Sequence, residues 1–113
     1  MGYLMYNLIQ TQEARNDLDK LTAYMIYSLM NGQAANHFLE QYKRQTLNLT
    51  TFPFGYRGIG IKYHGYEIRM KPFLTYHIFF VVDEKKHQIT ILRVLKDRQN
   101  WKTILHSDSE YSF

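Results

Sequence analysis

Three runs of strand-forming residues follow one another in the second half of the chain, and the short connections between them constrain the fold more than any other feature. The runs are YEIRMK (66–71), TYHIFFVV (75–82) and QITILRVL (88–95). The segments that join them, residues 72–74 and 83–87, are too short to hold the crossover helix that parallel neighbours would need. The three runs are therefore predicted to be antiparallel neighbours in one sheet.

The first half of the chain is predicted to form a short strand followed by two helices. Residues 3–9, YLMYNLI, have the aromatic and branched side chains of a strand. Thr11 is predicted to cap a helix. The apolar residues of this helix recur every three or four positions, at Ala14, Leu18, Leu21, Met25 and Leu29. Asn31 and Gly32 are predicted to end it in a left-handed conformation, and residues 33–49 are predicted to form the second helix of an antiparallel hairpin.

The resulting order, strand, helix, helix and three strands, is that of an α+β two-layer sandwich. The helical hairpin is expected to pack on one face of a mostly antiparallel four-stranded sheet. Alternation along strand 66–71 separates an apolar set from a charged set, namely Tyr66, Ile68 and Met70 from Glu67, Arg69 and Lys71. The helices are predicted to cover the apolar face and to leave the charged face open.

Composition and length indicate one globular domain, predicted over residues 1–105, with a polar tail at 106–113. The absence of cysteine excludes a disulfide framework and a thiolate metal site. No signal-like start is present, and no apolar run approaches the roughly 18 residues of a membrane helix. The glycine-rich stretch GYRGIGIKYHG (55–65) lacks the ending of a phosphate loop and is predicted to be a flexible link. We therefore expect a cytoplasmic protein with no cofactor, no metal and no membrane partner.

Positive charge is concentrated in the second half of the chain. The formal net charge is +4. Residues 1–50 carry equal numbers of basic and acidic side chains, whereas residues 51–105 carry ten basic and four acidic ones. A surplus of this kind attracts polyanions or an acidic protein partner. The plainer alternative is a solvated basic face.

Three stretches of the sequence resemble the RelE/ParE superfamily of type II toxins. They are EARNDLDKLTAYM, LNLTTFPFGYRG and TYHIFFVVDEKKHQITILRVLKDRQNWKTIL. They occur in the same order as in the superfamily, and the similarity covers residues 4–105. The long final hairpin and the ending ILRVLKDRQNWKTIL are more similar to the ParE branch than to RelE itself.

The resemblance implies a plasmid-stabilisation toxin that causes growth arrest and is held inactive by a cognate antitoxin. Such antitoxins wrap a helix or extended segment over the toxin, and an acidic segment that is partly disordered when free would suit the basic half of this chain. ParE toxins act on DNA gyrase, and RelE toxins cut messenger RNA in the ribosomal A site. A third alternative is a family member without toxicity that works as a binding module.

The nuclease alternative predicts proton carriers and cations around one phosphate, because RNA cleavage without a metal needs a base, an acid and fixed positive charge. By resemblance, Arg69 stands where such enzymes carry a cation, while Glu67 and His77 stand where RelE has a lysine and an arginine. The terminal acid of several related nucleases has no counterpart, and His106 is the nearest candidate. The plainer alternative is that these side chains are ordinary exposed or paired residues. The predicted catalytic set is Glu67, Arg69, His77 and Arg98.

The ParE-like alternative predicts a binding surface on the open sheet face and the C-terminal segment. Trp101 is predicted to anchor this segment against the sheet edge and to hold the nearby cations in fixed geometry. Phe79 and Phe80 point to opposite faces of their strand, and we expect the antitoxin to cover one of them. A bulge in strand 88–95 would change the face that Arg93 occupies. The residues predicted to bind the target or the antitoxin are Arg69, Lys71, Arg93, Lys96, Arg98, Trp101 and Lys102.

Overall fold

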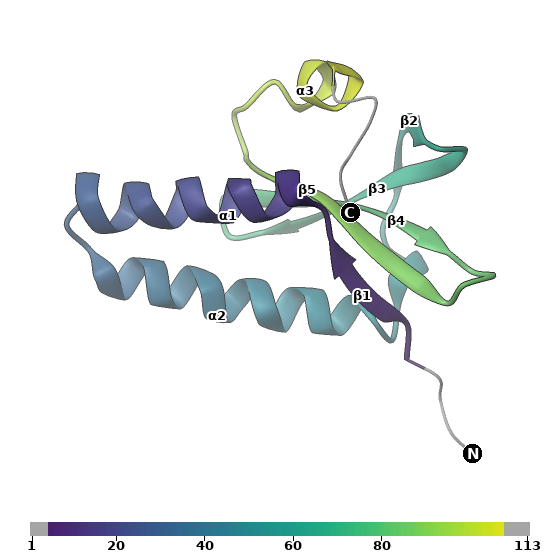
Figure 1. The fold of residues 1–113 in the computed structure, drawn as a ribbon, viewed down its shortest axis with the longest axis horizontal. Helices are drawn as coiled ribbons and strands as arrows, with labels where there is room; N and C mark the ends of the chain where they lie inside the picture. The colour runs from purple at the N-terminus through teal and green to yellow at the C-terminus, as the bar shows by residue number, and fades with distance from the viewer. Residues whose placement is uncertain (1–4, 108–113) are drawn as a thin grey trace.

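The computed structural model describes residues 5–107, which form one sheet of five strands and three α-helices (Figure 1). In chain order the elements are β1 (Asn7–Gln10), α1 (Gln12–Ala23), a π-helical turn (Tyr24–Ser28), α2 (Gly32–Leu49), a 3-10 turn (Pro53–Gly55), β2 (Gly58–Tyr63), β3 (Tyr66–Phe73), β4 (Tyr76–Asp83), β5 (Gln88–Lys96) and α3 (Trp101–Ser107). The first residues of the predicted strand 3–9 and most of the predicted tail lie outside the described residues. None of the helices within residues 5–107 has the length and apolarity that a membrane span requires.

The strand order is β1-β5-β4-β3-β2, with β1 parallel to β5 and the other neighbours antiparallel. The predicted α+β class and the antiparallel arrangement of β3, β4 and β5 are confirmed. The predicted strand count was wrong, because β2 forms within the stretch that we expected to be a flexible link. Glycine weakens the sequence signal of a strand. Gly60 has a φ of +81°, and the β2–β3 register is irregular between Gly58 and Lys62, so this edge strand contains a bulge.

Caps at both helix starts shape the helical hairpin. Thr11 caps α1 as predicted, since its hydroxyl accepts a hydrogen bond from the Ala14 N–H at 3.0 Å. Asn31 has a different role from the one predicted. Its side chain accepts a hydrogen bond from the Ala34 N–H at 3.0 Å and thereby caps the start of α2. The left-handed residue of the connection is Met30, with a φ of 51°.

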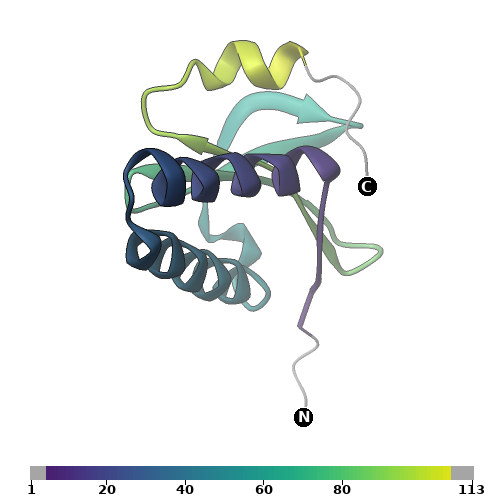
Figure 2. The same cartoon turned by 60° about the vertical axis from the view of Figure 1, so that its left-hand side comes forward.

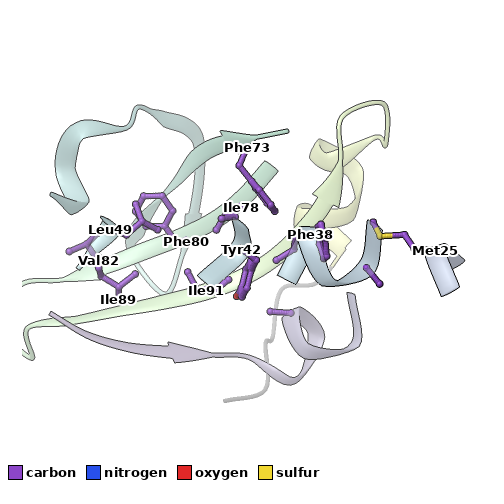
Figure 3. Close-up of a cluster of buried hydrophobic side chains, with 13 residues drawn as sticks. Met25, Phe38, Tyr42, Leu49, Phe73, Ile78, Phe80, Val82, Ile89 and Ile91 are labelled. Atoms are coloured by element: carbon purple, nitrogen blue, oxygen red, sulfur yellow. The ribbon is translucent and has the colours of Figure 1, made fainter. Parts of the chain in front are cut away.

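The helices lie on both sides of the sheet. Helices α1 and α2 lie side by side and cover one face, and Figure 2 shows α3 on the opposite side of the sheet from this pair. Two buried clusters correspond to these two sides. We call them the hairpin cluster, which includes Phe38, Phe80 and Ile91 (Figure 3), and the α3 cluster, which includes Phe79, Leu92 and Leu105.

Phe79 and Phe80 do point to opposite faces, but both have an exposed fraction of 0% within this chain alone. Phe80 belongs to the hairpin cluster. Phe79 is covered by α3, and its ring centroid lies 5.6 Å from that of Trp101. The expectation that an antitoxin covers one of these rings was therefore wrong. Trp101 packs over the face of the sheet, and the short helix α3 that carries it was not predicted.

Candidate functional site

The cross-strand register shows which side chains share each face of the sheet. Arg69 is paired with Phe80 of the hairpin cluster, and Met70 is paired with Phe79 of the α3 cluster. The predicted alternation along β3 is therefore present. However, its charged set shares the face that carries the helical hairpin, and Ile68 is buried on the other face beneath α3. The prediction of an open, charged sheet face was wrong.

The two β3 cations are used in contacts within the chain. Arg69 Nη1 donates a hydrogen bond to the Tyr56 carbonyl oxygen at 2.7 Å, and its guanidinium carbon lies 5.0 Å from the centroid of the Phe54 ring. Lys71 Nζ donates to the Gln45 carbonyl oxygen on α2 at 2.9 Å and lies 5.0 Å from the centroid of the Tyr56 ring. The exposed fraction of Lys71 is 3%. Arg69 and Lys71 thereby connect β3 to the end of α2 and to the segment between α2 and β2.

Arg93 is also engaged within the chain, by the buried carboxylate of Asp17 on α1. Its Nε and Nη2 donate to the two carboxylate oxygens at 2.7 and 2.8 Å, and the Val94 N–H adds a third hydrogen bond at 2.9 Å. The β4–β5 register shifts between Phe79 and Phe80, so β5 contains a bulge, a feature that the sequence had left open. The sequence analysis did not predict that Asp17 pairs with Arg93. The available signal was an acidic residue on the apolar stripe of the helix, three positions after Ala14.

The four residues of the nuclease hypothesis do not converge. Glu67 is exposed and shares the face of Arg69, with its side chain lying over Gly58. His77 lies on the opposite face, where its ring centroid is 6.2 Å from that of Phe79. Its Nε2 atom is 3.6 Å from Asp97 Oδ1. Arg98 is exposed in the loop after β5. The sheet therefore separates Arg69 and Glu67 from His77.

Of the cations that we predicted to bind a partner, the exposed ones lie at the end of β5 and on α3. Lys96 and Arg98 are exposed and line a hollow together with Thr75 and Asp97. Within residues 5–107, neither the Lys96 ammonium nor the Arg98 guanidinium has a hydrogen-bond or ion-pair partner. Lys102 is exposed on α3, with its Nζ 5.5 Å from the centroid of the half-buried Trp101 ring. Of the predicted binding residues, three are exposed, namely Lys96, Arg98 and Lys102.

An apolar groove adjoins this hollow, and the two share Thr75 and Lys96. The groove has a volume of about 560 Å³ and lies between the end of the helical hairpin and the β3–β4 turn. Tyr24 and Leu29 contribute from the hairpin, and Leu74 contributes from the turn. We call it the hairpin groove. It was not predicted, because its walls come from segments that are far apart in the sequence.

Comparison with models of known protein families identifies the family of this chain. Residues 8–101 match the family described as the ParE toxin of type II toxin-antitoxin systems, parDE. The chain belongs to the ParE toxin family. The resemblance to the RelE/ParE superfamily is thereby confirmed, and with it the prediction of a toxin component of a type II toxin-antitoxin system. A comparison with curated proteins finds no match.

Solved structures of both branches share the fold of this ParE-family chain. One is the chromosomal ParDE toxin-antitoxin system of P. aeruginosa, with 21% sequence identity, a TM-score of 0.64, and coverage of 83% of this chain and 98% of that one. The other is the RelBE2 toxin-antitoxin complex of Mycobacterium tuberculosis, with 19% identity, a TM-score of 0.55, and coverage of 84% and 94% respectively. At these identities the likeness concerns the fold.

Proposed function

We propose that this chain inhibits DNA gyrase in the bacterial cytoplasm by binding to it, and that a cognate antitoxin neutralises it. One observation carries the proposal: Arg69, Lys71 and Arg93 are engaged inside the protein, whereas Lys96 and Arg98 are free of partners within residues 5–107 and lie beside an apolar groove. A surface with apolar side chains and cations suits a protein partner.

The placement of the nuclease candidates supports binding over catalysis. Cleavage of RNA without a metal needs a base, an acid and a cation within hydrogen-bond reach of the same phosphate group. Here Glu67 and Arg69 lie on the hairpin face of the sheet, and His77 lies on the α3 face. A single phosphate in contact with Arg69 is therefore out of reach of the His77 imidazole.

The proposed antitoxin is acidic and partly disordered when free. Both structural relatives come from toxin-antitoxin systems, and the RelBE2 structure is described as a toxin-antitoxin complex. An acidic segment that orders on binding would neutralise the cations at the end of β5 while covering apolar surface. This partner also accounts for the surplus of basic residues in the second half of the chain.

A RelE-like, ribosome-dependent endonuclease is the second candidate, and the end of β5 favours it. His77 lies 3.6 Å from Asp97, and Arg98 follows in the same loop. A proton carrier beside a cation is part of the set of groups that RNA cleavage without a metal requires. In this alternative Arg98 and His77 would act at the phosphate, without Glu67 or Arg69.

Two assays on purified protein separate these candidates. In a gyrase supercoiling assay we expect inhibition that rises with toxin concentration. On translating ribosomes, primer extension should then show no A-site cleavage. Cleavage of A-site codons with full gyrase activity would overturn the proposal in favour of the endonuclease. Induced expression without antitoxin is expected to arrest growth, and normal growth would instead indicate a non-toxic binding module.

A further inference from the structure

The segment between α2 and β2 presents two phenylalanine rings to solvent. The exposed fractions of Phe52 and Phe54 are 76% and 45%, whereas the other four phenylalanines within residues 5–107 are buried. Neither ring belongs to the hairpin cluster or to the α3 cluster. Burial of an aromatic ring is favourable, so rings that stay in water and lie two positions apart indicate a contact surface.

Contacts within the chain hold both rings in a defined position. The Phe52 N–H donates a hydrogen bond to the Asn48 carbonyl oxygen at the end of α2, at 3.3 Å. The Arg69 guanidinium carbon lies 5.0 Å from the centroid of the Phe54 ring. The ring of Tyr6 lies edge-on to Phe54, with 6.4 Å between the centroids. Rings that are already ordered lose little conformational entropy when a partner binds to them.

The charge beside the two rings is positive. Residues 41–57 contain no acidic side chain and three exposed basic ones, namely Lys43, Arg44 and Arg57. Arg44 lies about one turn of α2 before Asn48, and Arg57 follows the 3-10 turn by two residues. Neither guanidinium group has a hydrogen-bond or ion-pair partner in the part of the chain that the structure describes. Glu67, whose side chain lies over Gly58, is an acidic group at the β2 end of this surface. We call Arg44, Phe52, Phe54 and Arg57 the phenylalanine patch.

We propose that the phenylalanine patch binds a single-stranded nucleic acid, with unpaired bases stacked on Phe52 and Phe54 and phosphate groups at Arg44 and Arg57. Exposed aromatic rings beside cations suit such a strand, because every base has a π-face and every nucleotide carries a negative charge. A double helix keeps its bases stacked on one another and cannot use the rings in this way. The inference goes beyond the proposed function, since it adds a nucleic-acid contact to a protein that is proposed to bind gyrase.

Fluorescence anisotropy on the purified full chain tests the proposal. An oligothymidylate of about 10 nucleotides, a typical site size for single-strand binders, is titrated at low salt beside the matching oligouridylate and a DNA duplex. We expect both single strands to bind more tightly than the duplex, and the tighter single strand identifies DNA or RNA as the source. Phe52→Ala is expected to weaken binding about tenfold, and Phe52→Trp to retain it. Tyr27→Ala, which removes a ring with an exposed fraction of 77% at the other end of α2, is the matched control and should bind normally.

The salt dependence of binding gives a second readout. Arg57→Gln is expected to reduce the slope of log affinity against log salt concentration by about 0.7, the value for one phosphate contact with a single strand. Lys20→Gln, at an exposed position of α1, should leave the slope unchanged.

Phe52→Ala keeps the test independent of folding, because the ring is exposed and its removal changes no charge. Its melting temperature is therefore expected to equal that of the wild type. Absence of binding to both single strands would overturn the proposal, and so would equal affinities of Phe52→Ala and wild type, since binding would then depend on charge alone. Weaker gyrase inhibition by Phe52→Ala without any nucleic-acid binding would also overturn it, and would assign the two rings to a protein interface.

Discussion

The carboxylate of Asp17 on α1 and the guanidinium of Arg93 on β5 form a bidentate ion pair, with N···O distances of 2.7 and 2.8 Å. Asp17 has an exposed fraction of 7%, and the Val94 N–H donates a further hydrogen bond to it. The carboxylate therefore has three donors in a site largely removed from water. Such a pair holds α1 in a defined position over the last strand.

Replacing Asp17 by alanine is expected to destabilise the protein by about 3 kcal/mol, because the Arg93 guanidinium and the Val94 N–H would both lose their buried acceptor. Urea denaturation followed by circular dichroism measures the change. Asp19→Ala, an exposed acidic residue on the same helix, is the matched control and should stay within about 0.5 kcal/mol of wild type. Equal free energies of unfolding for the two variants would show that the ion pair makes no net contribution to stability.

Lys71 is expected to matter for stability and not for target binding. In Lys71→Met the side chain keeps its length but loses the hydrogen bond to the Gln45 carbonyl oxygen, for an expected loss of about 1 to 2 kcal/mol. The proposed inhibition of gyrase should be unchanged in the folded variant, since the Lys71 ammonium lies inside the protein. The exposed Lys62→Met serves as control for stability. A Lys71→Met protein with wild-type stability and weakened gyrase inhibition would contradict this assignment.

Trp101 is expected to hold α3 over the sheet. Trp101→Ala removes the ring that covers Phe79 and should destabilise the protein by about 2 to 3 kcal/mol. Undocking of α3 should also speed limited proteolysis near residue 100. Thr103→Ala, at an exposed position of the same helix, provides the comparison. Unchanged proteolysis in Trp101→Ala would mean that other contacts dock this helix.

The pKa of the Asp83 carboxylate at the β4–β5 turn is expected to lie below its ordinary value. The backbone N–H of Lys86, and then the Tyr66 hydroxyl, donate hydrogen bonds that lower the pKa of Asp83. The same contact with Asp83 raises the pKa of Tyr66. Because the folded-state pKa of Asp83 lies below the unfolded value of about 3.9, its contribution to stability is present above that pH and is lost as the pH falls through the folded pKa.

An NMR titration of the Asp83 carboxyl carbon tests this shift. In Tyr66→Phe the pKa of Asp83 should rise towards its ordinary value but stay below it, since the Lys86 N–H remains as a donor. A wild-type Asp83 that titrates at the ordinary value for aspartate would refute the hydrogen-bonded arrangement.

Local signals were sufficient to predict most of the fold. The antiparallel order of β3, β4 and β5 follows from turn lengths, the helical hairpin follows from apolar periodicity, and the cap at Thr11 follows from its chemistry. Each of these signals depends on residues that are near neighbours in the chain. β2 was not predicted, because the two glycines within it, Gly58 and Gly60, interrupt the side-chain pattern that marks a strand.

The sequence by itself determined that Arg69 and Lys71 share one face of their strand, since alternation is a property of the extended backbone. Only the tertiary structure decided that this face lies on the side of the hairpin, where Gln45 and Tyr56 engage both cations. Asp17 and Arg93 likewise meet across 76 positions of sequence. Which face of a sheet the helices cover depends on the total apolar surface that all helices and strands bury together. The alternation along a single strand does not determine this total buried area.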